Sequence, residues 1–195
     1  MANTGQMIEN PVTGQRILFL TCAKENGGTR WEVEWFIKPH QGKFPPEHFH
    51  PVFSERFEIL SGAARYKLNG QEHSARPGDT IHIPKGSTHM HPWSVSDEEL
   101  HMRQNFELDE PNVKLISGSE EFFESLFALA RDGKVGKDGL PNLLQFAVLA
   151  KAASPLAYPA GIPMSAVDIL FGALARLGSW LGYQARYPQY SGVER

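Results

Sequence analysis

The chain lacks the features that mark several large classes of protein. Cys22 is the single cysteine among 195 residues, which excludes an internal disulfide. The formal net charge is -3 and basic residues form no run, so the sequence lacks the electrostatic pattern of a nucleic-acid-binding protein. We therefore expect a reducing, cytoplasmic setting and a partner other than nucleic acid.

Long uninterrupted apolar segments are also missing. Residues 1–15 contain no charged start followed by an apolar core, so they predict neither a signal peptide nor a transit segment. The most apolar stretch, residues 165–183, is interrupted by Asp168 and Arg176, which argues against a membrane span. We expect this stretch to pack on the rest of the protein or on a second subunit, with contact at a membrane surface as the alternative.

What the sequence does contain, up to Phe106, is a series of short segments typical of β-strands. Gly, Pro or Asn-Gly recurs roughly every 8–12 residues, and the segments between them alternate apolar and polar positions. The segment 31–37 is the clearest example, with one apolar face and one mostly solvated face. Asn69 and Gly70 suit a tight hairpin turn. Together these features predict a sandwich or a small β-barrel.

After Pro111 the apolar spacing changes to that of helices. We expect three helices, at about residues 119–132, 141–153 and 165–183. Ser117 and Glu120 fit a capping box at the start of the first helix, and Asp168 is the expected capping residue of the third.

The length of the chain suits one domain with an appendage. We expect a β-barrel domain at residues 15–110. A helical C-terminal extension of about three helices is expected at residues 117–185. The predicted fold class is therefore mainly β, with an α-helical C-terminal extension.

Two motifs carry the candidate chemistry. The first consists of Gly42, five residues, His48-Phe49-His50, four residues, Glu55, six residues and Gly62. The second consists of Gly78, five residues, Pro84, one residue, Gly86, two residues and His89. In order and spacing they resemble the two characteristic motifs of the cupin superfamily.

The resemblance extends over residues 41–93 by motif and over about residues 15–106 by strand pattern. It implies a single cupin barrel, which is a double-stranded β-helix of jelly-roll type. One position departs from the family pattern, because the second motif usually ends in Asn and Trp93 stands there in this chain. That Asn is not generally a metal ligand, so the change affects local hydrogen bonding more than metal binding.

The physical chemistry of the motifs supports a metal site independently. His48 and His50 are two residues apart on a strand, so both imidazoles project from the same face. Glu55 follows five positions later, and a turn must intervene to bring its carboxylate to that face. Gly86 permits the tight reversal that delivers His89 from the next strand. We therefore predict that His48, His50, Glu55 and His89 hold one divalent transition metal.

Neutral imidazole and carboxylate are suitable ligands for Fe, Mn, Ni, Zn and Cu, so the ligand set does not select among them. Four protein ligands would leave one or two positions of an octahedron open for water, oxygen or substrate, as a catalytic metal requires.

Residues near the predicted ligands are candidates for further roles. His91 shares the inward parity of the second motif, so we predict that it donates or accepts a proton in catalysis. Tyr66, Met102 and Gln104 are predicted by parity to bind substrate. Arg103 alternates with Gln104, and the sequence does not decide which of the two faces the pocket. The other histidines are expected to be exposed or interfacial, namely His40, His73, His82 and His101.

Three functions fit these observations. The first is a metal-dependent oxygenase, or dioxygenase, that acts on a small organic substrate. The second is a metal-dependent isomerase or decarboxylase in which His91 moves a proton. The third is a non-enzymatic sensor that binds a small molecule. Proteins that resemble small cupins commonly pair through edge strands and exchanged termini, so a homodimer is expected.

Overall fold

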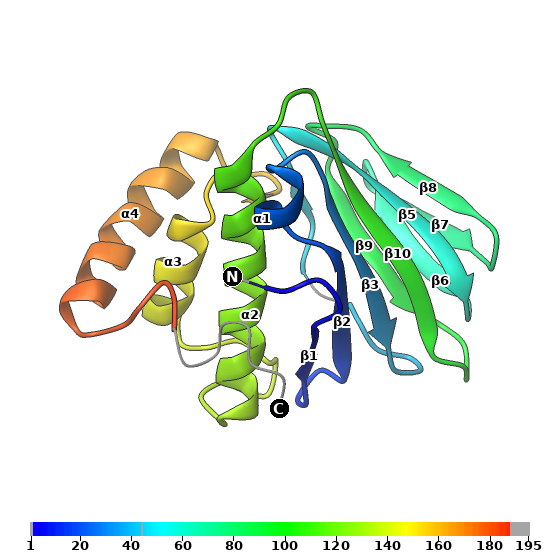
Figure 1. The fold of residues 1–195 in the computed structure, drawn as a ribbon, viewed down its shortest axis with the longest axis horizontal. Helices are drawn as coiled ribbons and strands as arrows, with labels where there is room; N and C mark the ends of the chain where they lie inside the picture. The colour runs from blue at the N-terminus through cyan, green and yellow to red at the C-terminus, as the bar shows by residue number, and fades with distance from the viewer. Residues whose placement is uncertain (1, 44, 188–195) are drawn as a thin grey trace.

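The computed structural model describes residues 2–43 and 45–187, which form two antiparallel sheets flanked on one side by helices (Figure 1). The larger sheet has the strand order β1 (Met7–Asn10), β2 (Gln15–Thr21), β3 (Trp31–Ile37), β10 (Leu100–Leu108), β5 (Phe53–Ser61) and β8 (Thr80–Ile83). The smaller sheet has the order β11 (Tyr158–Pro159), β4 (His48–Phe49), β9 (His89–Ser94), β6 (Ala64–Leu68) and β7 (Gln71–Ala75). This arrangement confirms the predicted mainly β jelly roll followed by C-terminal helices.

The strands form where the alternation of the sequence predicts them. In β3 the residues from Trp31 to Ile37 alternate strictly between buried and half-buried positions. Asn69 and Gly70 both adopt positive φ angles, of 50° and 79°, and connect β6 to β7 as a tight hairpin. Period-2 patterning and turn chemistry therefore agree in this half of the chain.

The helices lie at α1 (Ala23–Asn26), α2 (Val113–Arg131), α3 (Leu143–Ala152) and α4 (Met164–Trp180). The predicted capping box of α2 is wrong, because the helix begins one and a half turns earlier than expected. The side chain of Asn112 accepts a hydrogen bond from the backbone N–H of Leu115 and caps the helix there. Ser117 consequently lies inside α2, where its hydroxyl donates to the carbonyl of Val113.

The predicted capping role of Asp168 in α4 is also wrong. The helix begins directly after Pro163, without a side-chain cap, and Asp168 lies in its second turn. The Asp168 carboxylate accepts a hydrogen bond from the Tyr158 hydroxyl at 3.2 Å and pairs with the Lys151 ammonium at 3.3 Å. Asp168 therefore ties α4 to α3 and to β11.

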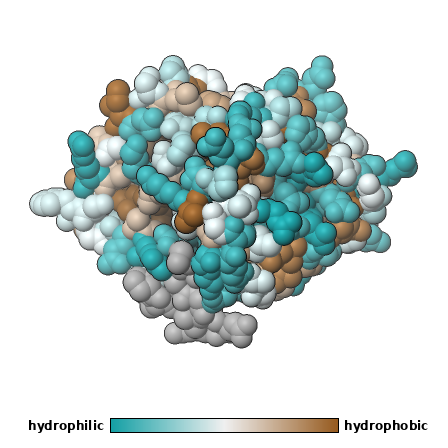
Figure 2. Space-filling view, turned by 45° about the horizontal axis from the view of Figure 1, so that its top comes forward, coloured by the Kyte–Doolittle hydropathy of each residue, from teal (hydrophilic) through white to brown (hydrophobic). Residues whose placement is uncertain are grey.

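Much of α4 is exposed to solvent. Its buried positions are Val167, Ala175 and Gly178. Several large apolar side chains of α4 and the residue after it are exposed, namely Ile169, Leu170, Leu177, Trp180 and Leu181. Figure 2 shows apolar patches among polar side chains in both the helical half, at the left, and the sheet half, at the right. Among the described residues, no helix has the length and apolar character needed to cross a membrane.

Helix α2 connects the helical layer to the sheets. It runs beside β1 (Figure 1). Its Phe123 ring stacks near Trp31 at 5.9 Å and meets Trp35 edge-on at 5.4 Å, measured between ring centroids. Burying a large apolar side chain contributes about 1.5–3 kcal/mol, so such contacts hold the helical layer against the larger sheet.

Candidate metal centre

Two sheets supply the residues of the two motifs. His48 and His50 come from β4 and the residue after its end, in the smaller sheet, and Glu55 comes from β5 in the larger sheet. The chain bends between the two strands at residues 51–52, which is the turn that the odd spacing of Glu55 requires. Here the chain passes from one sheet to the other, so the carboxylate faces the imidazoles across the interior.

The second motif brings in the fourth predicted ligand, His89. Gly86 has a φ of 80° and its N–H donates to the carbonyl of His50 at 2.8 Å, so the turn of the second motif is anchored on the first. His89 then pairs directly with His48 across β9 and β4. His91 follows two positions later on β9 and faces the same interior.

The five polar side chains meet in a buried cluster. The Nε2 atoms of His89 and His50 lie 2.9 Å and 3.2 Å from Glu55 Oε2, and His91 Nε2 lies 3.3 Å from Glu55 Oε1. The four imidazoles place ligand atoms within 4.8 Å of one another, with His48 as the fourth. Glu55 and His89 are both 0% exposed, so this cluster is screened from bulk water.

Backbone carbonyls orient three of the imidazoles. The Nδ1–H groups of His48, His50 and His89 donate to the carbonyls of Pro46, Leu156 and Ser87, at 2.8, 2.6 and 3.0 Å. Such bonds fix the tautomer and leave the Nε2 lone pair available, as in many metal-ligating histidines. The bond from His50 reaches the segment after α3, so the C-terminal part of the chain helps to orient this imidazole.

Atoms at the centre of the cluster have no hydrogen-bond partner among the described residues. They are Nε2 of His50, His89 and His91 and Oε2 of Glu55. Buried polar atoms of this kind are costly unless another group satisfies them. A divalent metal would satisfy them, since the donors are imidazole nitrogens and a carboxylate oxygen. The residues present therefore fit a bound transition metal.

The electrostatics of the cluster favour neutral imidazoles around an ionised carboxylate. Burial, together with the neighbouring imidazoles, holds the pKa of His48 well below its usual range. Burial also lowers the pKa of His91, although Glu55 opposes that shift. Burial acts to raise the pKa of Glu55, but the surrounding imidazoles outweigh it and hold that pKa well below its usual range. Neutral imidazole and ionised carboxylate are the forms that bind metal ions.

Gln104 lies directly behind the carboxylate. Its Nε2 donates to Glu55 Oε1 at 2.5 Å, and its Oε1 accepts from the indole N–H of Trp35 at 2.6 Å. Gln104 also lines a cavity that lies between the sheets and the helices. Arg103 points the other way and pairs with Glu34 at 3.0 Å, so the structure assigns the inward position to Gln104.

The other two predicted substrate residues lie away from this cavity. The ring of Tyr66 stacks on His73, at 5.1 Å between centroids, on the hairpin of β6 and β7. Met102 is 1% exposed and belongs to the hydrophobic core, where it pairs with Ile59 on the neighbouring strand. The inward parity of Met102 is confirmed, but its position along β10 places it outside the set of residues that line the cavity.

The remaining histidines lie outside the cluster. His40 pairs with Asp97, His82 with Glu107 and His101 with Glu34, at 2.9, 3.2 and 2.9 Å. Trp93, the position that departs from the family pattern, is buried, and the Lys43 ammonium lies 4.9 Å from its ring centroid.

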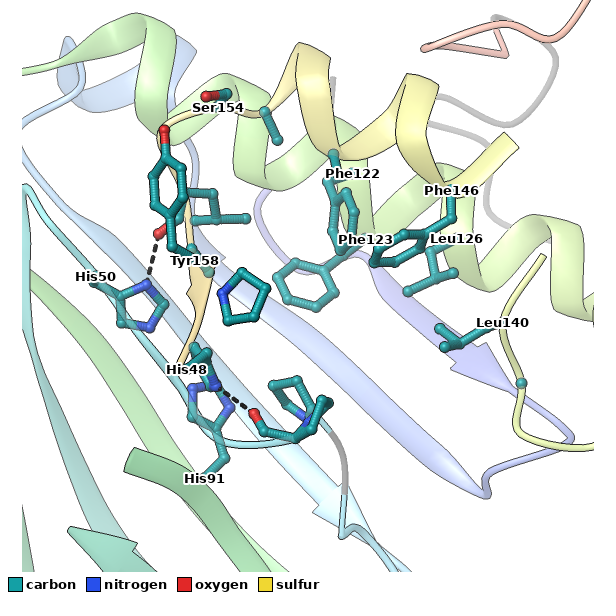
Figure 3. Close-up of a pocket in the computed structure, with 18 of the residues that line it drawn as sticks. His48, His50, His91, Phe122, Phe123, Leu126, Leu140, Phe146, Ser154 and Tyr158 are labelled. Atoms are coloured by element: carbon teal, nitrogen blue, oxygen red, sulfur yellow. Dashed lines mark hydrogen bonds between the residues drawn. The ribbon is translucent and has the colours of Figure 1, made fainter. Parts of the chain in front are cut away.

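The cluster opens into a cavity of about 310 Å³ between the sheets and the helices. Figure 3 shows the imidazoles of His48, His50 and His91 on one side of it, with the rings of Phe122 and Phe146 across from them. The sequence predicts the site inside the barrel and gives no indication of these helical walls. The available signal was the apolar spacing of the C-terminal helices, which indicates burial but not what they bury against.

Several known proteins are similar to this chain. The cupin domain model matches residues 33–106, which run from within β3 to within β10. An oxidoreductase of Arthrobotrys oligospora is 26% identical over 188 residues, covering 93% of this chain and 71% of that protein. A predicted oxalate decarboxylase from Thermotoga maritima has a similar structure, with a TM-score of 0.44 and 16% identity over 55% of this chain and 89% of that one.

A Cupin 2 conserved barrel domain protein from Salinispora arenicola is similar as well, with a TM-score of 0.42 and 16% identity over 52% of this chain and 82% of that one. The evidence for the family is the sequence match over residues 33–106, combined with two antiparallel sheets in which both motifs meet at one cluster. Residues 33–106 therefore match the cupin domain, and the two sheets have the cupin fold.

Proposed function

We propose that the protein is a metal-dependent oxygenase that acts on a small organic substrate. The observation that carries this proposal is the set of buried, unpartnered nitrogen and oxygen atoms that converge at one end of an apolar cavity. A related chain named as an oxidoreductase, 26% identical over 93% of this chain, supports a redox reaction. O2 is the oxidant that this proposal requires.

The proposed ligands are His48, His50, Glu55 and His89. Carbonyl groups orient three of these side chains, and Gln104 orients the fourth, so little reorganisation is needed for binding. A bound divalent transition metal, such as Fe, Mn, Ni, Zn or Cu, would supply Lewis acidity and, for the redox-active ions, electron exchange with O2. The apolar walls of the cavity exclude water from the reacting groups.

His91 is the proposed proton-transfer residue. Its imidazole lines the cavity, and its Nε2 lies 3.3 Å from Glu55 Oε1. Because burial lowers its pKa, the imidazole is neutral near pH 7 and can accept a proton from an enol or phenol held in the cavity. Gln104 lines the sheet side of the cavity, and we propose that the part of its side chain that faces the cavity contacts the substrate.

The test of this function is metal loading followed by an oxygen-consumption assay. Metal-free protein would be titrated anaerobically with Fe(II), Mn(II), Ni(II) or Cu(II) and then supplied with O2 and a panel of enols, catechols and diketones. We expect oxygen uptake that depends on both the metal and the substrate. Tight metal binding without oxygen uptake across the panel would contradict the oxygenase proposal and leave the metal site intact.

The alternative is a metal-dependent isomerase or decarboxylase on the same scaffold. The position of His91 favours it, since a neutral imidazole beside the cluster suits the transfer of a proton to or from a carbon next to a carbonyl. His91→Asn distinguishes the oxygenase from the isomerase or decarboxylase. The substitution should abolish proton transfer, whereas oxygen uptake by the metal-loaded protein should fall less. A non-enzymatic sensor would instead bind its ligand without turnover of either kind.

We also propose that the protein is a cytoplasmic homodimer. The exposed apolar side chains of α4, with Trp180 at 81% exposure and Ile169 at 74%, support association through this helix. Sedimentation velocity at micromolar concentration tests it, with Trp180→Ser as the disrupting variant. A wild-type protein that sediments as a monomer would contradict the dimer.

A further inference from the structure

An unbroken series of aromatic rings leads from the larger sheet to α4. Phe123 contacts Trp35 on the sheet and its neighbour Phe122, at 5.4 and 5.3 Å between centroids. Phe122 then meets Phe146 of α3 at 6.1 Å, and Phe146 meets Phe171 of α4 at 6.2 Å. All five rings line the cavity, and Figure 3 shows those of Phe122, Phe123 and Phe146 on the side opposite the imidazoles.

Lys151, Asp168 and Glu47 are charged residues of the cavity wall that form ion pairs. The ammonium of Lys151 lies 3.3 Å from the carboxylate of Asp168, which also accepts the Tyr158 hydroxyl. Glu47 pairs with Lys67 at 2.6 Å. Apart from the histidines, Lys151 is the one basic side chain among the described lining residues. The walls away from the imidazoles thus offer no unpaired cation to a carboxylate or a phosphate.

We propose that the cavity binds a molecule with an apolar, ring-bearing body and an oxygen-bearing end, and that the C-terminal helices select it. The oxygen-bearing end lies at the imidazole cluster, and the body lies among Phe122, Phe146 and Phe171. This inference deepens the proposed function and rests on it for the role of the cluster. Apolar cavities with a few convergent polar groups bind ligands in this manner, the polar groups setting their orientation.

The selecting rings lie outside the part of the chain that matches the cupin domain. Phe122, Phe146 and Phe171 belong to three different helices, all beyond residue 106. The barrel thus supplies the polar end of the cavity and the helices supply its apolar walls. Aromatic rings pack best against flat unsaturated groups through stacked and edge-on contacts, so a fused-ring phenol suits the cavity better than a sugar acid or a dicarboxylate.

The test is calorimetric titration of metal-free protein with 2-naphthol, with oxalate and glucose 6-phosphate as polar probes. We expect 2-naphthol to bind with a one-to-one stoichiometry and the polar probes to bind at least tenfold more weakly. Because the protein is metal-free, this result does not depend on oxygenase activity. Equal or tighter binding of oxalate or glucose 6-phosphate would overturn the proposal.

Cavity-filling variants locate the binding site. Ala150 lines the cavity on α3, whereas Ala152 on the same helix is exposed and lies outside the lining. Ala150→Leu should weaken 2-naphthol binding about tenfold or more, which corresponds to about 1.4 kcal/mol, because the larger side chain occupies space that the ligand needs. The matched control, Ala152→Leu, should bind 2-naphthol within about twofold of wild type. Equal affinity of both variants would overturn the placement of the ligand.

A second cavity-filling variant tests the same placement of the ligand if Ala150→Leu does not fold. Ala157 lines the cavity from an exposed position between α3 and β11, so Ala157→Leu adds bulk without overpacking the core. It should also weaken 2-naphthol binding, with its circular dichroism unchanged. Unchanged affinity in a folded Ala157→Leu protein would count against the proposal. Loss of oxygen uptake with 2-naphthol binding retained would contradict the oxygenase function and leave this inference standing.

Discussion

Glu55 in the sheet half and Glu120 on α2 are both 0% exposed, yet their pKa values shift in opposite directions. At Glu55 the surrounding imidazoles outweigh burial, and the pKa is held well below its usual range. At Glu120 burial dominates, and it raises the pKa to about 7 despite a hydrogen bond from the Ala23 N–H. In the sheet half, imidazoles surround the carboxylate of Glu55. In the helical half, Glu120 has too few favourable partners to offset the effect of burial on its pKa.

The same contrast extends to the cavity between the two halves. On the sheet side, polar atoms of four imidazoles and a carboxylate converge from β4 and the residue after its end, from β5 and from β9. On the helical side, the walls are phenylalanine rings and aliphatic side chains. Chemistry at the polar end and recognition at the apolar end should therefore respond to different substitutions.

The largest effect is expected for His89→Ala. His89 is fully buried and its Nε2 faces Glu55 at 2.9 Å, so the substitution removes one of the proposed metal ligands. Metal affinity should fall by roughly 100-fold or more, since even outer partners of ligands contribute about 10–100-fold. Isothermal titration of the metal-free protein with Zn²⁺ or Mn²⁺ measures this loss.

Thermal unfolding supplies an independent readout for the same variant. Free metal at about 100 times its dissociation constant stabilises a native protein by about 2.7 kcal/mol, so it should raise the Tm of the wild type by several degrees. His89→Ala should lose that increase, and 2-naphthol binding should persist. The matched control is His82→Ala, which removes an exposed imidazole on β8. A wild-type Tm insensitive to metal would contradict the metal centre.

The convergence at the cluster could be predicted from the sequence because strand parity and glycine turns are local properties. His48 and His50 share a face by alternation, and Gly86 at positive φ makes the reversal before His89. Parity also selected Gln104 correctly as a residue of the interior. Strand parity does not show how far along a strand the cavity extends, so it also predicts Met102 at the cavity.

Long-range partners in the helical half could not be predicted. The carbonyl of Leu156 lies 106 residues from His50 in the chain, and no local pattern indicates that the two meet. The start of α2 was misplaced for a related reason, because Ser117 and Glu120 fit a capping box by spacing alone. Asn112 caps the helix instead, and the Glu120 carboxylate accepts a hydrogen bond from the Ala23 N–H.

The second prediction concerns the hydrogen bond that Gln104 donates to Glu55. Gln104→Leu removes the amide that links Trp35 to the carboxylate and leaves the metal ligands themselves in place. We expect metal affinity to fall about 10–100-fold, as for other partners that orient a ligand. Gln71→Leu, on the exposed strand β7, is the matched control. Unchanged metal affinity in Gln104→Leu would show that Glu55 needs no such support.

The smallest effect is expected for Glu120→Gln, and it depends on pH. The folded pKa of Glu120, about 7, lies above the ordinary value of 4.5, so the folded state holds a proton that the unfolded state releases more readily. The stability that this proton provides is fully present below about pH 4.5 and is lost as pH rises through 7. Wild type should therefore lose stability between pH 5 and 8.

Glu120→Gln removes this loss, because its amide stays neutral and its carbonyl can still accept from the Ala23 N–H. At pH 8 the variant should be about 1–2 kcal/mol more stable than wild type, a figure reduced from about 1.4 kcal/mol per pKa unit for screening by water. At pH 5 the two should be nearly equal. Thermal unfolding at both pH values measures the difference, with the exposed Glu98→Gln as control. A variant less stable than wild type at pH 8 would mean that Glu120 is ionised and well partnered, and the contrast between the two buried carboxylates would then disappear.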